Sequence, residues 1–399
     1  MFSSRLRFGS AANAMAGLTP NAITQALSKL RDAGAPLLDL TETNPTLVGL
    51  AYPSAIAGAL ADPGVLTYAP EPLGLPSARE AASLECSRSA DPVDADRVVL
   101  TTSTSEAYAL LFKLLCDPGD SVLVPQPSYP LFESLAGLEA VRADPYRLEY
   151  HGRWSIDRDS LLGALSSRTR AILVVTPNNP TGSMLRAADR DWLVALAAER
   201  DVAIISDEVF RDYTLEPAAD AASLSGESHA LTFVLGGLSK SAGLPQMKLG
   251  WIAVNGPESL AARAMAELEV ICDTYLSVTT SVQLAAPALI EAGRDIRAAI
   301  HERISRNLAS LQRVLAGESP VSLLTPEGGW SAVLRVPATE SEEALVLRLL
   351  NEFHVIVHPG YFFDFATEAF LVVSLLPAPA DFDEGIRRVL ADVHAGAAH

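Results

Sequence analysis

Six short apolar runs of strand length lie between residues 98 and 255. They are Val98–Thr101, Ser121–Pro125, Ala171–Thr176, Val202–Ser206, Leu231–Leu235 and Trp251–Val254. Because these runs are uninterrupted rather than alternating, they favour strands buried on both faces, as in a parallel sheet. Helical patterns separate several of them, at Ser105–Cys116, Tyr129–Leu138 and Ala187–Arg200. This alternation of strand and helix predicts an α/β fold.

The last third of the chain has a different pattern. After Val254 it is mostly helical as far as Leu315. Short strands are then predicted at Ser331–Val336, Val355–Val357 and Phe370–Ser374, followed by a helix at Asp381–Val393. We therefore expect a separate, smaller α+β unit after the parallel sheet.

Length and hydropathy set the broad class of protein. A chain of 399 residues is too long for one ordinary core, so about two domains are expected. Apolar residues make up 49% of the chain, but no uncharged apolar run reaches the length of about 18 residues that a membrane span needs. The segment Met1–Met15 lacks the apolar stretch of a secretory signal. We expect no membrane partner and no secretion.

Charge and cysteine content narrow the possible partners. The formal net charge of −18 would repel a phosphate backbone, so nucleic acid is not an expected partner. An anionic cofactor would need a local positive site on this negative chain. Cys86, Cys116 and Cys272 cannot all pair, and none lies in a CxxC spacing. The sequence therefore predicts reduced thiols in a cytoplasmic protein, and no metal site.

Polar residues cluster where the predicted strands end, and ligands of open parallel sheets bind at those ends. Thr104 and Ser105 follow the first strand at a predicted helix start, where hydroxyls and free N–H groups can hold an anion. An ordinary N-cap formed by Ser105 and Glu106 is the alternative. Tyr129 follows the second strand, and taken alone this aromatic residue fits core packing.

Two further strand ends carry distinctive polar residues. Asn179 lies in the loop Thr176–Gly182, where two asparagines between prolines also fit plain turn chemistry. Asp207 ends a buried strand, and a buried carboxylate needs a partner. Taken alone, a salt bridge to a surface arginine would supply that partner.

A single lysine lies among small residues after the fifth apolar run, in the segment Gly237–Lys240. A dry, cramped turn disfavours the ammonium form, so the pKa of Lys240 is expected to fall. The neutral amine could then form a Schiff base with a carbonyl compound. A second cation, Lys248, follows within ten residues.

Taken in order, Tyr129, Asn179, Asp207 and Lys240 resemble the signature of the class I/II pyridoxal-phosphate (PLP) aminotransferases. The resemblance spans about residues 18 to 395 and implies the aspartate aminotransferase-like fold type I. It implies a large PLP-binding domain, residues 46–284, with a mostly parallel seven-stranded sheet sandwiched by helices. Both chain ends, residues 1–45 and 285–399, would form the smaller α+β domain.

The resemblance also implies a role for each matching residue. Lys240 would be the catalytic Schiff-base lysine, Tyr129 would stack on the cofactor ring, Asn179 would bind its phenolic oxygen and Asp207 its ring nitrogen. The phosphate contacts implied are Thr104, Ser105, Ser239 and Lys248, the last in place of the family's usual arginine. Tyr68 would reach the phosphate of the other subunit, so a homodimer with a shared active site is expected; an ordinary loop tyrosine is the alternative.

The chain departs from the family pattern at the substrate side. Val372 occupies the position of the arginine that grips a substrate carboxylate, a strong two-point contact. Arg335 and Arg211 are candidate replacements. Thr43 replaces a glycine near the substrate, and Tyr361 is expected to line the pocket. At position 210 a phenylalanine replaces a tyrosine that usually donates to the cofactor's phenolic oxygen.

The resemblance implies transfer of an amino group between an amino donor and a 2-oxo acid through pyridoxamine phosphate. The alternative is a PLP lyase or synthase of the same fold, such as a carbon–sulfur lyase or a cyclopropane-carboxylate-synthase-like enzyme. A PLP-fold sensor is a second rival. A dinucleotide-binding dehydrogenase is not favoured, because no GxGxxG follows the first strand.

Overall fold

The computed structural model describes residue 5 and residues 21–88, 92–216 and 219–397. The N-terminal segment in which we expected no secretory signal lies, apart from residue 5, outside these residues. The largest element is an eight-stranded sheet with the strand order β2-β9-β8-β7-β6-β3-β4-β5. Its strands are β2 (Val98–Thr101), β3 (Ser121–Gln126), β4 (Arg142–Tyr150), β5 (Trp154–Ile156), β6 (Thr169–Val175), β7 (Ala203–Asp207), β8 (Thr232–Gly237) and β9 (Gly250–Asn255).

The sheet is mostly parallel, as the uninterrupted apolar runs predict. The pairs β8–β7, β7–β6, β6–β3 and β3–β4 are parallel, while β9 runs antiparallel between β2 and β8. The resemblance implied seven strands, and this number is corrected to eight because β5 adds an antiparallel edge strand to β4. Strands β4 and β5 each have a single buried residue, Tyr146 and Trp154, among exposed or partly exposed ones, so they give no uninterrupted apolar run to detect.

Helices cover both faces of this sheet, which explains why its strands are apolar on both sides. Alternate residues face opposite cores: Val98 and Leu100 join one buried cluster, while Val99 joins the other. The first cluster includes residues of α4 (Pro76–Ser87), α8 (Ala187–Arg200) and α11 (Thr280–Val314). The second includes α5 (Thr104–Leu115), α6 (Phe132–Leu138) and α10 (Glu258–Tyr275).

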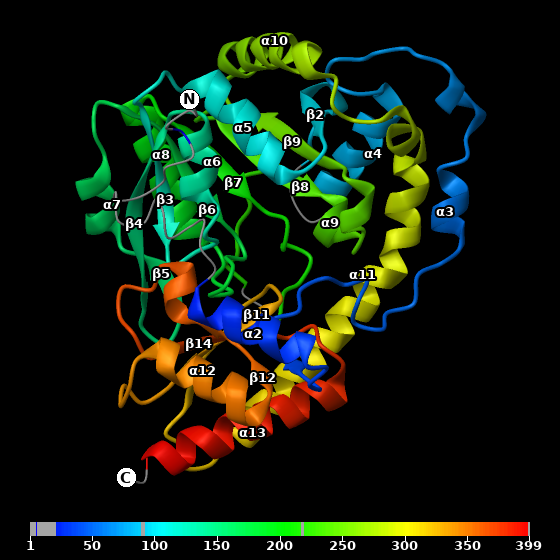
Figure 1. Cartoon of the computed structure of the whole chain (residues 1–399). Helices are drawn as coiled ribbons and strands as arrows, with labels where there is room; N and C mark the ends of the chain where they lie inside the picture. The colour runs from blue at the N-terminus through cyan, green and yellow to red at the C-terminus, as the bar shows by residue number, and fades with distance from the viewer. Residues whose placement is uncertain (1–4, 6–20, 89–91, 217–218, 398–399) are drawn as a thin grey trace.

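A second, smaller sheet has the order β10-β11-β14-β13. Its strands are β10 (Ser322–Leu324), β11 (Ser331–Arg335), β13 (His358–Pro359) and β14 (Phe370–Ser374). In the first forty residues β1 (Leu38–Asp39) pairs in parallel with β12 (Val355–Ile356), so this strand lies beside the last third of the chain. Helices α2 (Ala22–Asp32), α12 (Glu342–Phe353) and α13 (Pro379–Ala397) accompany these strands in the lower part of Figure 1.

Helix α11 joins the two parts of the molecule. It is 35 residues long and runs from beside the large sheet down to the small one (Figure 1). The expected boundary at residue 285 lies within this continuous helix, and the division into domains stays a prediction. The remaining described elements are the short helices α3 (Ala55–Ala59), α7 (Arg158–Ala164) and α9 (Leu238–Ser241) and the 3-10 turns η2 (Pro63–Leu66), η3 (Ala95–Arg97), η4 (Pro245–Met247) and η5 (Gly360–Phe363).

Within the described residues, no helix has both the length and the apolar character that crossing a membrane requires.

Candidate active site

The predicted site residues come together at the carboxyl ends of the parallel strands. The start of α5 follows β2, Asp207 ends β7, and α9, which carries Lys240, follows β8. Trp330 and Ser331, at the start of β11, close the site from the side of the small sheet. Together these segments enclose a cavity of about 340 Å³.

Most of the residues singled out from the sequence line this cavity. They are Thr43, Thr104, Ser105, Tyr129, Asn179, Asp207, Ser239, Lys240 and Lys248. The sequence interpretation did not assign Ser103, Phe132 or Ser331 to the site, although all three line it. Ser103 adjoins Thr104, and Phe132 is three residues from Tyr129, so proximity to assigned residues was the available signal for these two. Ser331 begins β11 of the small sheet, where no such signal was present.

Three of the expected site residues are not brought to this cavity. Tyr68 is 81% exposed and borders a separate groove with Tyr275. Arg335 ends β11 opposite Phe370 with an exposed side chain. Tyr361 packs edge-on against Phe362 outside the cavity lining. Within one described chain, therefore, neither Arg335 nor Tyr361 contacts the space beside Lys240.

Val372 lies where the resemblance placed a substrate-binding arginine. It is only 2% exposed and belongs to an apolar cluster with Trp154, Val333 and Phe363. Arg211, the other candidate cation, lies 3.7 Å from the buried carboxylate of Glu208. The cations among the described lining residues are Lys240 and Lys248.

Lys240 lies against two aromatic faces. Its Nζ is 4.6 Å from the ring centroid of Trp330 and 5.3 Å from that of Phe210. Burial lowers the pKa of Lys240 from 10.5 to about 8, while the charge of Asp207 acts in the opposite direction. The amine is therefore far more often neutral near pH 7 than an ordinary lysine, as a nucleophilic or proton-moving amine requires. Phe210 offers a ring here but no hydrogen-bond donor.

Asp207 is almost fully buried at the end of β7. Burial raises its pKa from 3.8 to about 6. Two hydrogen bonds act against this: the backbone N–H of Val209 donates to Oδ1 at 3.2 Å, and the Tyr108 hydroxyl donates to Oδ2 at 3.0 Å. Tyr108 was missed from the sequence because a tyrosine on the apolar face of a helix has the pattern of an ordinary core residue.

The start of α5 has a cap different from the one considered from the sequence. The N-cap is Ser103, whose Oγ accepts from the N–H of Glu106 at 3.2 Å. The Glu106 carboxylate in turn accepts from the N–H of Thr102 at 2.6 Å. This reciprocal pair leaves Thr104 and Ser105 in the first helical turn and facing the cavity, where N–H groups and hydroxyls suit an anion.

The two adjacent asparagines have separate tasks. Asn178 is buried and donates to the carbonyl of Pro127 and to the hydroxyl of Thr181, so it fixes the loop. Asn179 lines the cavity and accepts a hydrogen bond of 3.3 Å from Ser331. Gly182, at φ +69°, lets this loop approach the segment before Trp330: a side chain there would meet the Gly328 carbonyl.

Side-chain donors from three segments hold the backbone around Lys240. The Tyr213 hydroxyl donates to the Lys240 carbonyl at 2.6 Å and the Tyr52 hydroxyl to that of Gly243 at 2.8 Å. Arg297 of α11 donates to the Ser241 carbonyl at 2.8 Å. These contacts fix the turn that presents the amine, since each adds a side-chain donor to a carbonyl in or just after the short helix α9.

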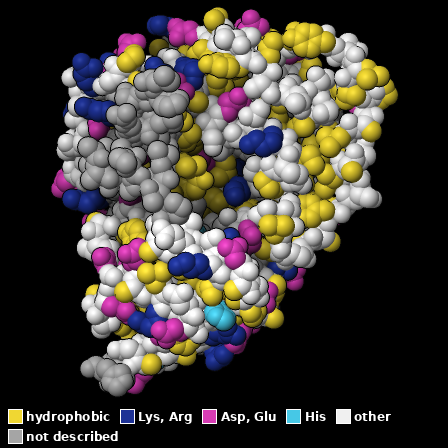
Figure 2. All heavy atoms as spheres, viewed as in Figure 1, with side chains coloured by type: hydrophobic (Ala, Val, Ile, Leu, Met, Phe, Trp, Pro, Cys, Tyr) yellow, Lys and Arg dark blue, Asp and Glu magenta, His cyan; other side chains and the backbone are white. Residues whose placement is uncertain are grey.

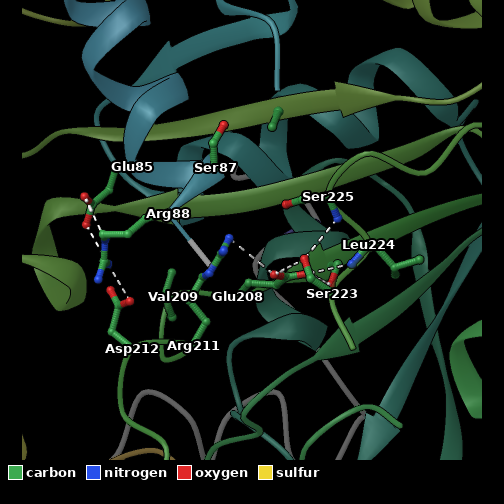
Figure 3. A network of polar contacts seen from close by, with 12 residues as sticks. Glu85, Ser87, Arg88, Glu208, Val209, Arg211, Asp212, Ser223, Leu224 and Ser225 are labelled. Carbon is green, nitrogen blue, oxygen red and sulfur yellow. Dashed lines mark hydrogen bonds and ion pairs between the residues drawn. The ribbon is translucent and has the colours of Figure 1, made fainter. Parts of the chain in front are cut away.

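Arg297 belongs to a buried ion network behind the lysine turn. It donates to Glu85 at 2.6 Å and lies 3.7 Å from Asp212. Arg88 bridges the same two carboxylates, at 3.0 Å from Glu85 and 2.5 Å from Asp212 (Figure 3). Figure 3 also shows Glu208 on the other side of the network, bonded to Ser223 and Leu224.

Replacing Arg297 by leucine should destabilise the protein by about 3 kcal/mol, because the buried carboxylates lose a partner. Thermal or urea unfolding measures the change. Arg294→Leu on the same helix is the matched control: its ion pair with Glu291 is exposed, so a loss below about 1 kcal/mol is expected. Equal losses in the two variants would show that the network does not anchor this turn.

Comparisons with known proteins agree on one family. A family model described as aminotransferase class I and II matches residues 34–389. The chain is 27% identical over 383 residues to an alanine aminotransferase of Mycobacterium tuberculosis, covering 92% of this chain and 88% of that relative. It is 28% identical over 304 residues to an arginine–pyruvate transaminase of Pseudomonas aeruginosa, covering 76% of each. The solved structure of an alanine aminotransferase from Pyrococcus furiosus matches with a TM-score of 0.86 at 24% identity, covering 99% of this chain and 100% of that chain.

Proposed function

We propose, from the premise that this chain belongs to the aminotransferase class I and II family, that the cavity around Lys240 is its active site. The fold is the aspartate aminotransferase-like fold type I that the resemblance implied, and the enzyme is a PLP-dependent transaminase. It moves an amino group between an amino donor and a 2-oxo acid. The observation that carries the assignment of the site is the meeting of a lysine of lowered pKa with a buried carboxylate in one cavity.

The residues present fit this cofactor. Lys240 supplies an amine that can join an aldehyde, and Asp207 supplies a buried negative charge for a protonated ring nitrogen. Thr104, Ser105 and Ser239 add hydroxyls for a phosphate, and Lys248 adds a positive charge. This last contact keeps the charge of an arginine but not its planar two-point grip.

When bound, PLP supplies an electron sink for the negative charge that develops on a substrate carbon. Lys240 acts first as a nucleophile and then as the group that moves a proton at its Nζ. The aromatic walls of Trp330 and Phe210 keep that amine partly desolvated. The Tyr108 hydroxyl and the Val209 N–H hold the Asp207 carboxylate in place, so this charged group need not reorganise during the reaction.

The transaminase differs from a lyase in what a donor alone produces. With donor and no acceptor, a transaminase should release about one oxo product per active site and then stop, since the amino group stays on the enzyme. A lyase would continue to turn over under the same conditions. The named relatives transfer amino groups, and nothing in the comparisons favours the lyase. Continued turnover without acceptor would reject the transaminase proposal.

The names of the relatives suggest which substrates to test first. One is an alanine aminotransferase and another an arginine–pyruvate transaminase, so pyruvate and alanine form the first pair. Because Val372 stands in an apolar cluster at the expected arginine position, the carboxylate contact must come from elsewhere. Amines without a carboxylate therefore belong in the same screen.

We also infer a homodimer. Large apolar side chains lie exposed on the large-sheet part of the chain: Leu47 (69%), Leu66 (89%), Tyr68 (81%), Val270 (70%) and Tyr275 (54%). In the view of Figure 2, hydrophobic side chains gather toward the right, over the region of α3 and the upper part of α11. Exposed apolar surface of this kind is typical of subunit interfaces. A second copy of the chain would cover this apolar surface and bring its own Tyr68 toward the cavity around Lys240 of the first copy.

Hybrid dimers test whether Tyr68 acts in the partner's site. A heterodimer of Lys240→Ala and Tyr68→Ala subunits should have one intact site and thus about half the activity of the native dimer. Each variant homodimer would have two defective sites. If Tyr68 served its own subunit, the heterodimer would have no intact site and its activity would stay low. Differently tagged subunits allow the hybrid to be isolated and assayed.

A cytoplasmic location is proposed from the three unpaired cysteines among the described residues. Cell fractionation tests it, and recovery of the protein outside the cytoplasm would reject it.

A further inference from the structure

We propose that Tyr108 is a positioning residue that fixes the Asp207 carboxylate for the ring nitrogen of the cofactor. The inference rests on the proposed function, in which Asp207 faces that nitrogen. Tyr108 lies in α5, the same helix whose first turn presents Thr104 and Ser105 to the cavity. One helix would thus serve both the phosphate end and the nitrogen end of the site.

The geometry clamps the carboxylate from two directions. The Tyr108 hydroxyl donates to Oδ2 at 3.0 Å, and the Val209 N–H donates to Oδ1 at 3.2 Å. One donor comes from a helix and the other from the chain just after β7. With each oxygen held by a different element, rotation of the carboxylate about its χ2 would break both hydrogen bonds. Its remaining lone pairs are left for the cavity.

Tyr108 approaches Asp207 from the core side. It is 3% exposed, and the described cavity lining includes Asp207 but not Tyr108. Its ring lies edge-on to Phe132, with centroids 5.4 Å apart, and 6.0 Å from Phe112. These rings hold the phenol in place. Tyr108 would therefore act on the cofactor only through Asp207, which is the meaning of a positioning residue here.

A buried hydroxyl needs a partner, and among the described residues Asp207 is the one that Tyr108 contacts by a hydrogen bond. Phenylalanine would fill the same apolar space without that requirement. The hydroxyl stabilises the charged form of the carboxylate, which burial otherwise disfavours. The ring of Tyr108 thus fills space in the core, while its hydroxyl stabilises the charge of Asp207.

The other charged or titratable groups that affect Asp207 come from different elements. Glu208, its chain neighbour, raises the pKa of Asp207, and Lys240 of α9 lowers it. Tyr129, at the cavity wall, has its own pKa raised by burial and by the charge of Asp207. Unlike Glu208, Lys240 and Tyr129, Tyr108 donates a hydrogen bond to the Asp207 carboxylate. Its removal should therefore shift the titration of Asp207 upward while leaving Glu208 and Lys240 in place.

The test compares Tyr108→Phe with Tyr146→Phe. Tyr146 is equally buried, and its hydroxyl donates to the Leu173 carbonyl at 2.8 Å within the same sheet. Each variant loses one buried hydroxyl, so loss of packing or general stability should be similar. Only the Tyr108 change removes a donor from Asp207.

Two readouts are independent of turnover. Aspartate carboxyls are labelled with ¹³C, the Asp207 signal is assigned through Asp207→Asn, and its pKa is measured in the apoprotein. Tyr108→Phe should raise this pKa by about one unit and weaken PLP affinity at pH 7.5 about tenfold, the size of a lost hydrogen bond to a charged group. Tyr146→Phe should leave both values unchanged.

The outcomes separate this inference from the function on which it rests. If the native protein forms no borohydride-stable link to PLP, the proposed function fails. If it does, and Tyr108→Phe changes the pKa of Asp207 and the PLP affinity no more than Tyr146→Phe does, the positioning role is overturned. In an Asp207→Asn background, the tenfold effect of Tyr108→Phe on affinity should disappear. Its persistence there would also overturn the proposal.

Discussion

Lys240→Ala should abolish transamination, with a fall of at least about 10⁴-fold in kcat/KM, because one amine performs two tasks. In the proposed function it would be both the nucleophile that joins the cofactor and the base that moves the substrate proton. The structure explains why another residue would not replace it: Lys248 is the remaining lysine of the described lining, and it lies beyond α9, directly after the turn η4. Steady-state rates with pyruvate and a panel of donors measure the loss.

The same variant gives a structural readout. After incubation with PLP and borohydride, the native polypeptide should gain the mass of one reduced cofactor, whereas Lys240→Ala should gain none. Lys248→Ala is the control, since it keeps the amine of Lys240 and should still be labelled, with weaker cofactor affinity. Labelling of Lys240→Ala to the native extent would show that another amine is the attachment point.

The strand ends could be predicted because the physics of a parallel sheet acts locally. A strand buried on both faces must be apolar throughout, and its polar residues begin where burial ends. This is why the strand ends that carry Asp207, Asn179 and Lys240 are predictable without knowledge of contacts between distant residues, whereas the roles of these residues come from the resemblance to a known family. The structure brings all three to one cavity.

Residues that act through long-range contacts were not predictable in this way. Tyr213 and Tyr52 support the lysine turn through their hydroxyls, but their sequence neighbourhoods indicate nothing beyond ordinary aromatic residues. Arg297 lies 56 residues from the carbonyl to which it donates. Only the packing of α11 beside the turn makes that contact visible. The same limitation applies to Arg335, whose position in the sequence gave no information on the direction of its side chain.

Asp207→Asn is expected to lower kcat/KM by about 10²–10³-fold, the usual cost of removing one preorganised electrostatic group. Asparagine keeps the size of the side chain and still accepts from Tyr108, but it carries no charge to pair with a protonated ring nitrogen. Glu208→Gln is the matched control, since its carboxylate is equally buried but bonded to Ser206, Ser223 and Leu224. That variant should lose stability while its PLP affinity remains close to native.

The pH dependence of the apoprotein provides an independent check on Asp207. Its pKa is raised from 3.8 to about 6 in the folded state, so the folded state binds this proton more tightly than the unfolded state does. Stability from this group is therefore full below about pH 4 and is lost as the pH rises through 6, by about 3 kcal/mol in total. Urea unfolding of the apoprotein between pH 4 and 7 should show this decline in the native chain and lack it in Asp207→Asn. An identical profile in both would mean that burial does not destabilise the charged form of Asp207. The unfavourable burial of that charge, which a protonated ring nitrogen would relieve, would then be absent.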